Sequence, residues 1–280
     1  MKLVRFGEIQ REKPGVIDAT GVLRDASSII DKWSGNALDD DSLARVRAAM
    51  EELPIVDSSP RLGAPVCDVG KVVGIGLNYR AHAAEAGLDV PIDPIIFLMA
   101  PTAINGPTDD IILPRGSVNT DWEVELAVII GKGGAYIAPE DALSHVAGYC
   151  VANDVTERDY QLNRGTQWTK GKSADTFLPL GPILVTRDEV PDPQNLHLEL
   201  FLNGELQQRG HSADMIFTVA ELISRVSEYM SWQPGDVMIT GTPPGVGLGM
   251  SPPQFLRDGD MLCLRINNFG EQCARVRAAQ

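Results

Sequence analysis

The sequence predicts an α+β protein that is mainly β, with a small α+β unit at its amino end. Strand signals follow one another, with few helices between them, from Lys71 to the end of the chain. Before them, the segment VDSSPRLGAPVCDVGK interrupts every periodic pattern with proline, glycine and serine. We therefore predict a small amino-terminal domain over residues 1–68 and a larger domain over residues 69–280.

The amino-terminal unit begins with short strand-like pieces, KLVRF, PGVIDA and GVLRDA. A helix is expected over residues 41–52, because Leu43, Val46 and Met50 lie on one face at helical spacing. The run LDDDS at 38–42 resembles the start of a calcium loop, but it lacks the ligand spacing and the terminal glutamate of such a loop. We interpret it as the solvated start of the helix.

The larger domain contains nine segments that read as strands: KVVGIGL, IIFLMA, DIILP, WEVELAVII, AGYCVAND, GPILVT, HLELFLNG, DVMITG and MLCLRI. The clearest helix is predicted over residues 218–230, where Thr218 and Glu221 form a capping box ahead of an apolar stripe. A second helix is expected over residues 139–147, since it would begin at a proline and stop at Gly148.

Composition and charge exclude several classes of protein. The chain has 280 residues and a formal charge of −14, which argues against a nucleic-acid-binding protein with its usual basic face. The first fifteen residues, MKLVRFGEIQREKPG, lack the apolar region of a secretory signal. No apolar run reaches the length of a membrane-spanning helix, so no membrane partner is expected. These features predict a cytoplasmic protein.

The four cysteines, at positions 67, 150, 263 and 273, are scattered without a C-x-x-C pair or a metal-type spacing. This pattern favours free thiols in a reducing compartment over a disulfide framework.

Two carboxylates stand side by side in the segment DWEVELAVIIGK. Glu123 and Glu125 are two positions apart on a predicted strand, so they share a face with Cα atoms roughly 6.5 Å apart. Such a pair suits a single cation, although an isolated E-x-E is more often a solvent-facing stripe. Asp154 adds a third carboxylate at the end of another strand, GYCVAND. Three acids without a histidine or cysteine partner would suit Mg²⁺ or Mn²⁺ better than Zn²⁺.

A histidine–glutamate pair lies in the segment GLNYRAHAAEAG. Asn78 is expected to cap a short helix that Gly87 ends, and His82 and Glu85 then lie one turn apart on the same face. A histidine oriented by a carboxylate is a common general base, but a surface pair has the same spacing. The G-x-G at 74–76 lacks the third glycine and the β-α-β pattern of a dinucleotide loop.

Further polar groups follow Asp154. Arg158 and Gln161 would share one face of a short helix, where Arg158 could pair with a substrate carboxylate or form a surface ion pair with Glu157 or Asp159. The loop QWTKGKSADTF then carries two lysines, which are either solvated or part of a site.

The segment TGTPPGVGLG follows the strand DVMIT and is not a P-loop, because it has no G-K-[ST]. Its backbone amides and threonine hydroxyls could receive an anion, or the segment could be a purely structural turn.

Together these segments closely resemble the fumarylacetoacetate hydrolase superfamily. Six motifs occur in the order of that family across residues 71–267: GLNYRAHAAE, WEVELAVIIGK, GYCVANDVTERDYQ, WTKGKSADTFLPLGP, LNGE…MIF and TGTPPGVG. One departure is visible, since many relatives have an aspartate directly before the histidine, where this chain has Ala81.

The resemblance implies a role for each matching residue. The metal ligands fall on Glu123, Glu125 and Asp154. The catalytic residues fall on His82, Glu85 and Lys172, and the substrate-binding residues on Arg158, Gln161 and Thr242.

The resemblance also implies a β-roll or sandwich-like catalytic domain, a homodimer and one Mg²⁺ or Mn²⁺ ion per chain. The expected reaction is hydrolysis of a C–C bond in a small anionic 2-keto acid, a 2,4-diketo acid of the acylpyruvate type, with release of pyruvate. The chain looks most similar to acylpyruvate hydrolases and to 2,4-diketo-3-deoxy-L-rhamnonate or -fuconate hydrolases. Decarboxylation of oxaloacetate and isomerisation of a 2-hydroxydienoate are the alternatives.

Overall fold

The computed structural model describes residues 1–57 and 59–279. It has two main sheets, and the longer one runs through the whole molecule in the order β3-β2-β1-β14-β11-β10-β17-β5-β6, with β4 paired to β1. Its strands are β1 (Lys2–Phe6), β2 (Lys13–Ile17), β3 (Leu23–Asp25), β4 (Leu62–Gly63), β5 (Val72–Gly76), β6 (Ile95–Met99), β10 (Val124–Ile130), β11 (Val146–Asn153), β14 (Leu184–Thr186) and β17 (Val237–Ile239).

The second sheet has the order β16-β15-β18-β19-β8 and packs on the first through contacts of β15 with β10 and of β18 with β11. Its strands are β8 (Ile111–Leu113), β15 (His197–Leu202), β16 (Glu205–His211), β18 (Met261–Ile266) and β19 (Glu271–Ala278). Two small pairs complete the strands: β7 (Ile104–Asn105) with β13 (Leu178–Pro179), and β9 (Thr120–Asp121) with β12 (Thr156–Glu157). The predicted mainly-β, sandwich-like α+β fold is therefore confirmed.

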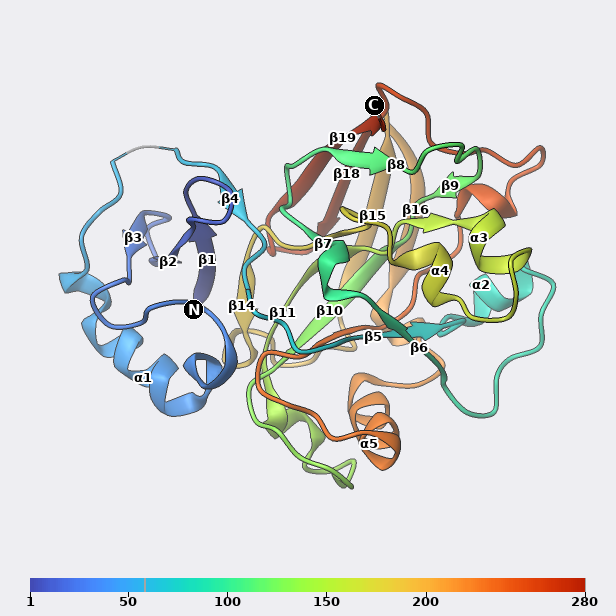
Figure 1. Cartoon of the computed structure of the whole chain (residues 1–280). Coiled ribbons are helices and arrows are strands. Elements are labelled where there is room, and N and C mark those ends of the chain that lie inside the picture. The colour runs from blue at the N-terminus through green and yellow to red at the C-terminus, as the bar shows by residue number, and fades with distance from the viewer. Residues whose placement is uncertain (58, 280) are drawn as a thin grey trace.

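The amino-terminal unit stands beside the rest of the chain but shares its longer sheet (Figure 1). β1 pairs antiparallel with β14, with Leu3 opposite Leu184. Apolar side chains from both sides of this junction also belong to one continuous core. Sheet and core thus run across position 68, where sequence composition places the domain boundary.

The helices match the sequence pattern where local signals are strong. They are α1 (Asp40–Ala49), α2 (Arg80–Glu85), α3 (Arg158–Leu162), α4 (Thr169–Lys172) and α5 (Val219–Tyr229). The LDDDS run starts α1 as expected, because the Asp39 side chain accepts the Ser42 N–H and caps the helix. The capping box of Thr218 and Glu221 opens α5.

The other helical segments of the described residues are short 3₁₀ turns: η1 (Gly35–Leu38), η2 (Met50–Glu52), η3 (Pro101–Ala103), η4 (Ala142–His145), η5 (Arg187–Glu189), η6 (Ser212–Asp214) and η7 (Gly247–Gly249). The helix expected over residues 139–147 is thus reduced to η4, since β11 already begins at Val146. No helix in residues 1–57 and 59–279 is both long and apolar enough to cross a bilayer.

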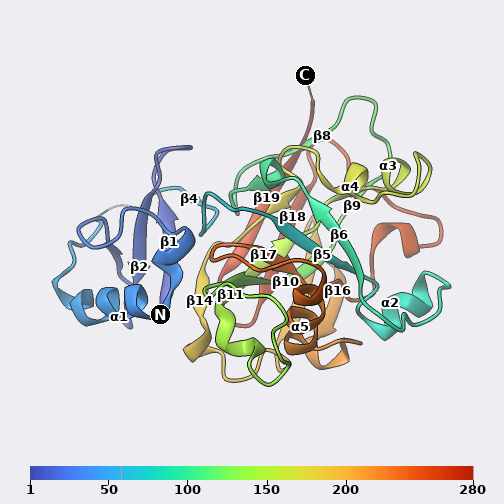
Figure 2. The ribbon, with the colours of Figure 1, turned by 60° about the horizontal axis from the view of Figure 1, so that its bottom comes forward.

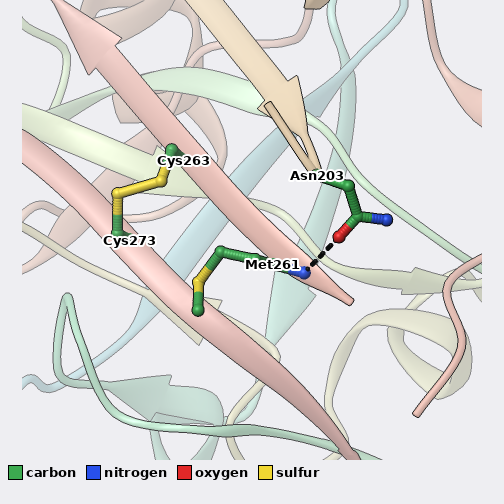
Figure 3. The surroundings of a disulfide bond; sticks show 4 residues. All are labelled: Asn203, Met261, Cys263 and Cys273. Atoms are coloured by element: carbon green, nitrogen blue, oxygen red, sulfur yellow. Dashed lines mark hydrogen bonds between the residues drawn. A yellow bond between two sulfur atoms is a disulfide. The ribbon is translucent and has the colours of Figure 1, made fainter. Parts of the chain in front are cut away.

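The expectation of four free cysteines is wrong for one pair. Cys263 and Cys273 face each other on β18 and β19 and form a disulfide, with Cα atoms 4.2 Å apart (Figure 3). Antiparallel pairing explains this, because it brings residues equally distant from a turn to the same level of the hairpin. Cys67 and Cys150 remain free thiols.

Helices α2, α3 and α4 lie together at the end of the molecule away from the amino-terminal unit (Figures 1 and 2). They flank the edge of the longer sheet where β5 and β6 lie, and α4 contacts both α3 and β6. The residues that sequence analysis singles out come largely from this end.

Candidate metal centre and its pocket

Three buried carboxylates meet where β10 begins and β11 ends. The two strands are antiparallel, with Val124 opposite Asn153, so Glu123 directly before β10 lies beside Asp154 directly after β11. The backbone N–H of Asp154 donates to the carbonyl of Glu123 at 3.0 Å. One oxygen from each of Glu123, Glu125 and Asp154 lies within 4.8 Å of the other two. The structure thus brings together the three predicted ligands.

Two cations balance part of this negative charge. The ammonium of Lys172, at the end of α4, donates to Glu123 at 2.8 Å and to Asp154 at 2.5 Å. Arg158, at the start of α3, lies 2.7 Å from the other oxygen of Glu123. Burial would raise the pKa of Glu123, but Lys172 and Arg158 outweigh it and lower that pKa to about 2.

At the other two acids the cations do not outweigh burial. Burial, with repulsion from Asp154 and Glu123, raises the pKa of Glu125 well above its ordinary value. Burial also raises the pKa of Asp154 to about 7, although Lys172 opposes the change. Oδ1 of Asp154 is buried and has no hydrogen-bond partner in the described chain. An orphaned carboxylate oxygen in an all-oxygen cluster is the donor set that fits a hard divalent cation.

Backbone amides and carbonyls hold the cluster in place. The N–H of Gly241 donates to Oε2 of Glu125 at 2.6 Å, so the Gly/Pro-rich turn after β17 does receive an anion, one from within the chain. Thr242, in the same turn, donates its hydroxyl to the carbonyl of Val124 and accepts from Gln208 of β16. The turn therefore anchors the start of β10 from the side of the second sheet.

Asp121 is a functional candidate that the sequence pattern did not single out. Its buried carboxylate accepts from Nε of Arg158 at 2.8 Å and from the backbone N–H groups of Gly247 and Leu248. Arg158 is consequently a buried link between Asp121 and Glu123, and the surface ion pair with Glu157 or Asp159 does not form. The signal for Asp121 was present, as the third acid in D-W-E-x-E.

The histidine–glutamate pair lies on α2 as expected from its spacing. Nδ1 of His82 is 2.9 Å from Oε2 of Glu85, and Oε1 of Glu85 accepts the N–H of Gly245 at 2.8 Å. The predicted cap is wrong, because the Asn78 side chain accepts from Phe217 N–H and donates to backbone carbonyls instead. Glu85 thus orients the imidazole and ties α2 to the turn after β17.

All the site residues predicted from the sequence except Asp154 line one pocket of about 280 Å³. His82 and Glu85 face the same cavity as Glu123, Glu125 and Lys172. Arg158, Gln161 and Thr242, the predicted substrate-binding residues, line it as well. Ile75 and Gly249, which lie 174 positions apart along the chain, therefore line the same cavity.

Such a pocket can perform defined chemistry. A histidine beside a carboxylate can move a proton, and a carboxylate cluster with a cation can hold an anionic oxygen ligand. The Lys172 ammonium stays charged, because attraction to Asp154 and Glu123 raises its pKa although burial acts in the opposite direction.

Comparisons with known proteins place the chain in a family. The family model described as fumarylacetoacetate (FAA) hydrolase C-terminal matches residues 71–277. A protein of Burkholderia cenocepacia named "Putative hydrolase" is 53% identical over 282 residues, covering 100% of both chains.

Two solved structures also match over their full length. The fumarylacetoacetate hydrolase from psychrophilic Exiguobacterium antarcticum is 37% identical with a TM-score of 0.86, covering 100% of both chains. Maleylpyruvate hydrolase from Sphingobium sp. SYK-6, solved with manganese(II) and pyruvate, is 28% identical with a TM-score of 0.82 and the same coverage. With its matching motifs, fold and carboxylate cluster, the chain belongs to the fumarylacetoacetate hydrolase family.

Proposed function

We propose that the protein is a hydrolase that depends on a divalent metal and cleaves the C3–C4 bond of a 2,4-diketo acid of the acylpyruvate type, releasing pyruvate. One observation carries the proposal: the His82–Glu85 pair opens into the same pocket as the carboxylates Glu123 and Glu125. The acyl half could be a simple acyl group or the hydroxylated end of a 2,4-diketo-3-deoxy sugar acid.

Glu123, Glu125 and Asp154 would hold the metal, Mg²⁺ or Mn²⁺. When bound, the ion supplies Lewis-acid polarisation of the α-keto-carboxylate end of the substrate. The relative from Sphingobium supports this choice, since its solved structure contains manganese(II) and pyruvate.

His82 would act as the general base. Glu85 accepts a hydrogen from Nδ1, which leaves Nε2 free to take a proton from water. The water oxygen attacks C4, and the electron pair of the C3–C4 bond stays on C3. C3 then takes up a proton to give pyruvate, and C4 leaves in a carboxylic acid.

The remaining polar groups would hold the substrate. Lys172 supports the negative oxygens of the pyruvate half, next to Glu123 and Asp154. Gln161 directs its amide towards the substrate, because its carbonyl oxygen already accepts from Arg158. Arg158 acts mainly by fixing Glu123 and Gln161, and Thr242 shapes the pocket floor.

The test is pyruvate release with Mg²⁺ from three compounds: acetylpyruvate, oxaloacetate and a 2-hydroxydienoate. We expect release from acetylpyruvate to require both Mg²⁺ and His82. Decarboxylation of oxaloacetate needs no attacking water, so it would survive in His82→Ala. Conversion of oxaloacetate alone, or equal rates for His82→Ala and the unaltered protein on acetylpyruvate, would overturn the proposal.

Two properties complete the proposal. The protein is expected to form a homodimer, as the family resemblance implies, and sedimentation equilibrium measures this directly. It is expected to work in the cytoplasm, where the Cys263–Cys273 pair would face reducing conditions.

A further inference from the structure

Much of the pocket lining is apolar. We call five of its large apolar residues the apolar wall: Ile75, Phe97, Leu162, Trp168 and Leu248. They come from β5, β6, α3, the start of α4 and η7, so the wall is assembled from separate segments around the cavity. No serine, asparagine or tyrosine lines the pocket in the described chain.

Two glycines of β5 make room for the aromatic part of this wall. A Cβ atom at Gly74 would lie 2.2 Å from the ring of Phe97, and one at Gly76 would lie 2.3 Å from the ring of Trp168. The two rings therefore lie directly on the strand backbone, with centroids 5.8 Å apart. An aromatic surface that needs a glycine beneath each ring is a built feature of the pocket.

The cations of the pocket are already engaged. Among the described lining residues, Lys172 and Arg158 are the lysine and arginine, and both pair with Glu123. Arg158 also binds Asp121, and Lys172 also binds Asp154. The divalent ion of the proposed function and these two cations face five acids in and around the pocket: Glu85, Asp121, Glu123, Glu125 and Asp154. A second carboxylate on the substrate would therefore enter without a counter-charge.

Hydrogen-bond donors are scarce too. The hydroxyl of Thr242 donates to the carbonyl of Val124, so its hydrogen is used. The amide nitrogen of Gln161 and the indole nitrogen of Trp168 have no hydrogen-bond acceptor in the described chain, which leaves two neutral side-chain donors. One donor serves the C4 carbonyl that every 2,4-diketo acid carries, and several hydroxyls on the acyl half would lose their bonds to water without replacement.

We infer that the acyl half of the substrate is an uncharged alkyl or aryl group, bound against the apolar wall. The inference rests on the proposed function for the pyruvate half. It predicts that acylpyruvates with a second carboxylate or several hydroxyls are poor substrates.

Two substrates of matched shape test the inference on the full-length, Mg²⁺-loaded protein. In 7-methyl-2,4-dioxooctanoate the acyl half ends in an isopropyl group, and in 2,4-dioxoheptanedioate a carboxylate of similar size replaces it. We expect kcat/KM for pyruvate release to be about 100-fold higher for the branched alkyl substrate. Equal values, or a preference for the diacid, would overturn the inference.

A variant then locates the effect in the wall. Leu162 lies at the end of α3 and is 53% exposed, so an arginine there can reach the pocket mouth without being buried. Leu162→Arg should improve the diacid relative to the alkyl substrate about tenfold. Leu162→Met is the matched control and should leave the ratio unchanged. The same shift in both variants would contradict a charge-based preference.

A binding experiment separates this inference from the proposed reaction. The acids 7-methyl-2-oxooctanoate and 2-oxoheptanedioate lack the C4 carbonyl and cannot be cleaved. Calorimetry should show about tenfold tighter binding of the alkyl acid. If no acylpyruvate releases pyruvate, the proposed function fails. The binding comparison still shows whether the pocket prefers an alkyl group to a carboxylate. Tighter binding of the diacid would overturn the inference alone.

Discussion

The carboxylate of Asp121 accepts the Nε hydrogen of Arg158 at 2.8 Å, and both side chains are buried. Through this contact Asp121 fixes the guanidinium that lies against Glu123, and it also holds the N–H groups of Gly247 and Leu248 at the pocket wall. A residue with no direct access to the pocket thereby positions two parts of its lining.

Asp121→Asn should therefore cost both stability and activity. Removal of this charge leaves the buried Arg158 guanidinium with Glu123 as its remaining ionic partner, so we expect the free energy of unfolding to fall by about 3 kcal/mol. kcat/KM should fall by about tenfold or more, as for other supports of ligating groups. Asp159→Asn is the control, because its partner Arg164 is exposed and the expected loss is below about 1 kcal/mol. Chemical denaturation measures the free energy of unfolding of both variants, and steady-state kinetics measures kcat/KM.

Glu125→Gln and Glu123→Gln should act in opposite directions on the metal-free protein. Burial and its acidic neighbours raise the pKa of Glu125, so a neutral amide resembles its preferred state and should raise Tm. Glu123 is ionised between Lys172 and Arg158, so its loss should lower Tm. Both variants should lose the Tm increase that Mg²⁺ gives the unaltered protein. Equal and parallel Tm shifts in the metal-free variants would contradict this charge distribution.

Stability without metal should decline as pH rises. The pKa of Asp154 is raised to about 7 from its ordinary 3.8, so the folded protein holds a proton that the unfolded chain releases. This contribution is fully present below about pH 4 and is lost as pH increases through about 7. Mg²⁺ competes with the same proton, so its affinity should increase from about pH 5.5 to about pH 8, because a carboxylate must be deprotonated to bind the metal. Calorimetry in two buffers of different ionisation enthalpy would detect the released proton.

Glu85→Gln tests the support of His82. The amide oxygen can still accept the Gly245 N–H, so the turn and the Mg²⁺ site should remain intact. The imidazole loses its carboxylate partner, and kcat for hydrolysis should fall about 100-fold. Titration with Mg²⁺, followed by Tm, separates this outcome from general disruption. A loss of Mg²⁺ binding in this variant would show that Glu85 serves the metal centre instead.

Removal of the disulfide should affect stability alone. Cys263 and Cys273 lie on β18 and β19 of the second sheet, and neither lines the pocket. The double variant Cys263→Ser/Cys273→Ser should lose about 2 kcal/mol, equivalent to about 5 °C in Tm. kcat should be unchanged. The matched variant Cys67→Ser removes a free thiol and should change Tm little.

Local signals in the sequence account for the features that were predicted correctly. The capping box of α5 and the Asp39 cap of α1 each depend on two residues three positions apart, so both can be predicted from a short stretch of sequence. The meeting of Glu123 with Asp154 depends on antiparallel pairing of β10 with β11, which periodicity alone does not specify. Family motifs supplied that pairing.

Long-range contacts account for the errors and omissions. Asn78 has the right residue type for a helix cap, but its side-chain oxygen accepts the backbone N–H of Phe217, 139 positions away, instead. Asp121 finds Arg158 only because β9 pairs with β12. The Cys263–Cys273 bond could have been found, since both cysteines lie five residues from Asn268 in the turn between their strands.

The separate origins of the carboxylates and the apolar wall have a consequence for how new specificities arise. Glu123, Glu125 and Asp154 lie at the ends of two central strands, whereas Leu162 and Leu248 come from a short helix and a turn at the periphery. Peripheral segments tolerate substitution better than paired strands do. Selection, or a directed library, can therefore alter the apolar wall while the carboxylate cluster is inherited unchanged.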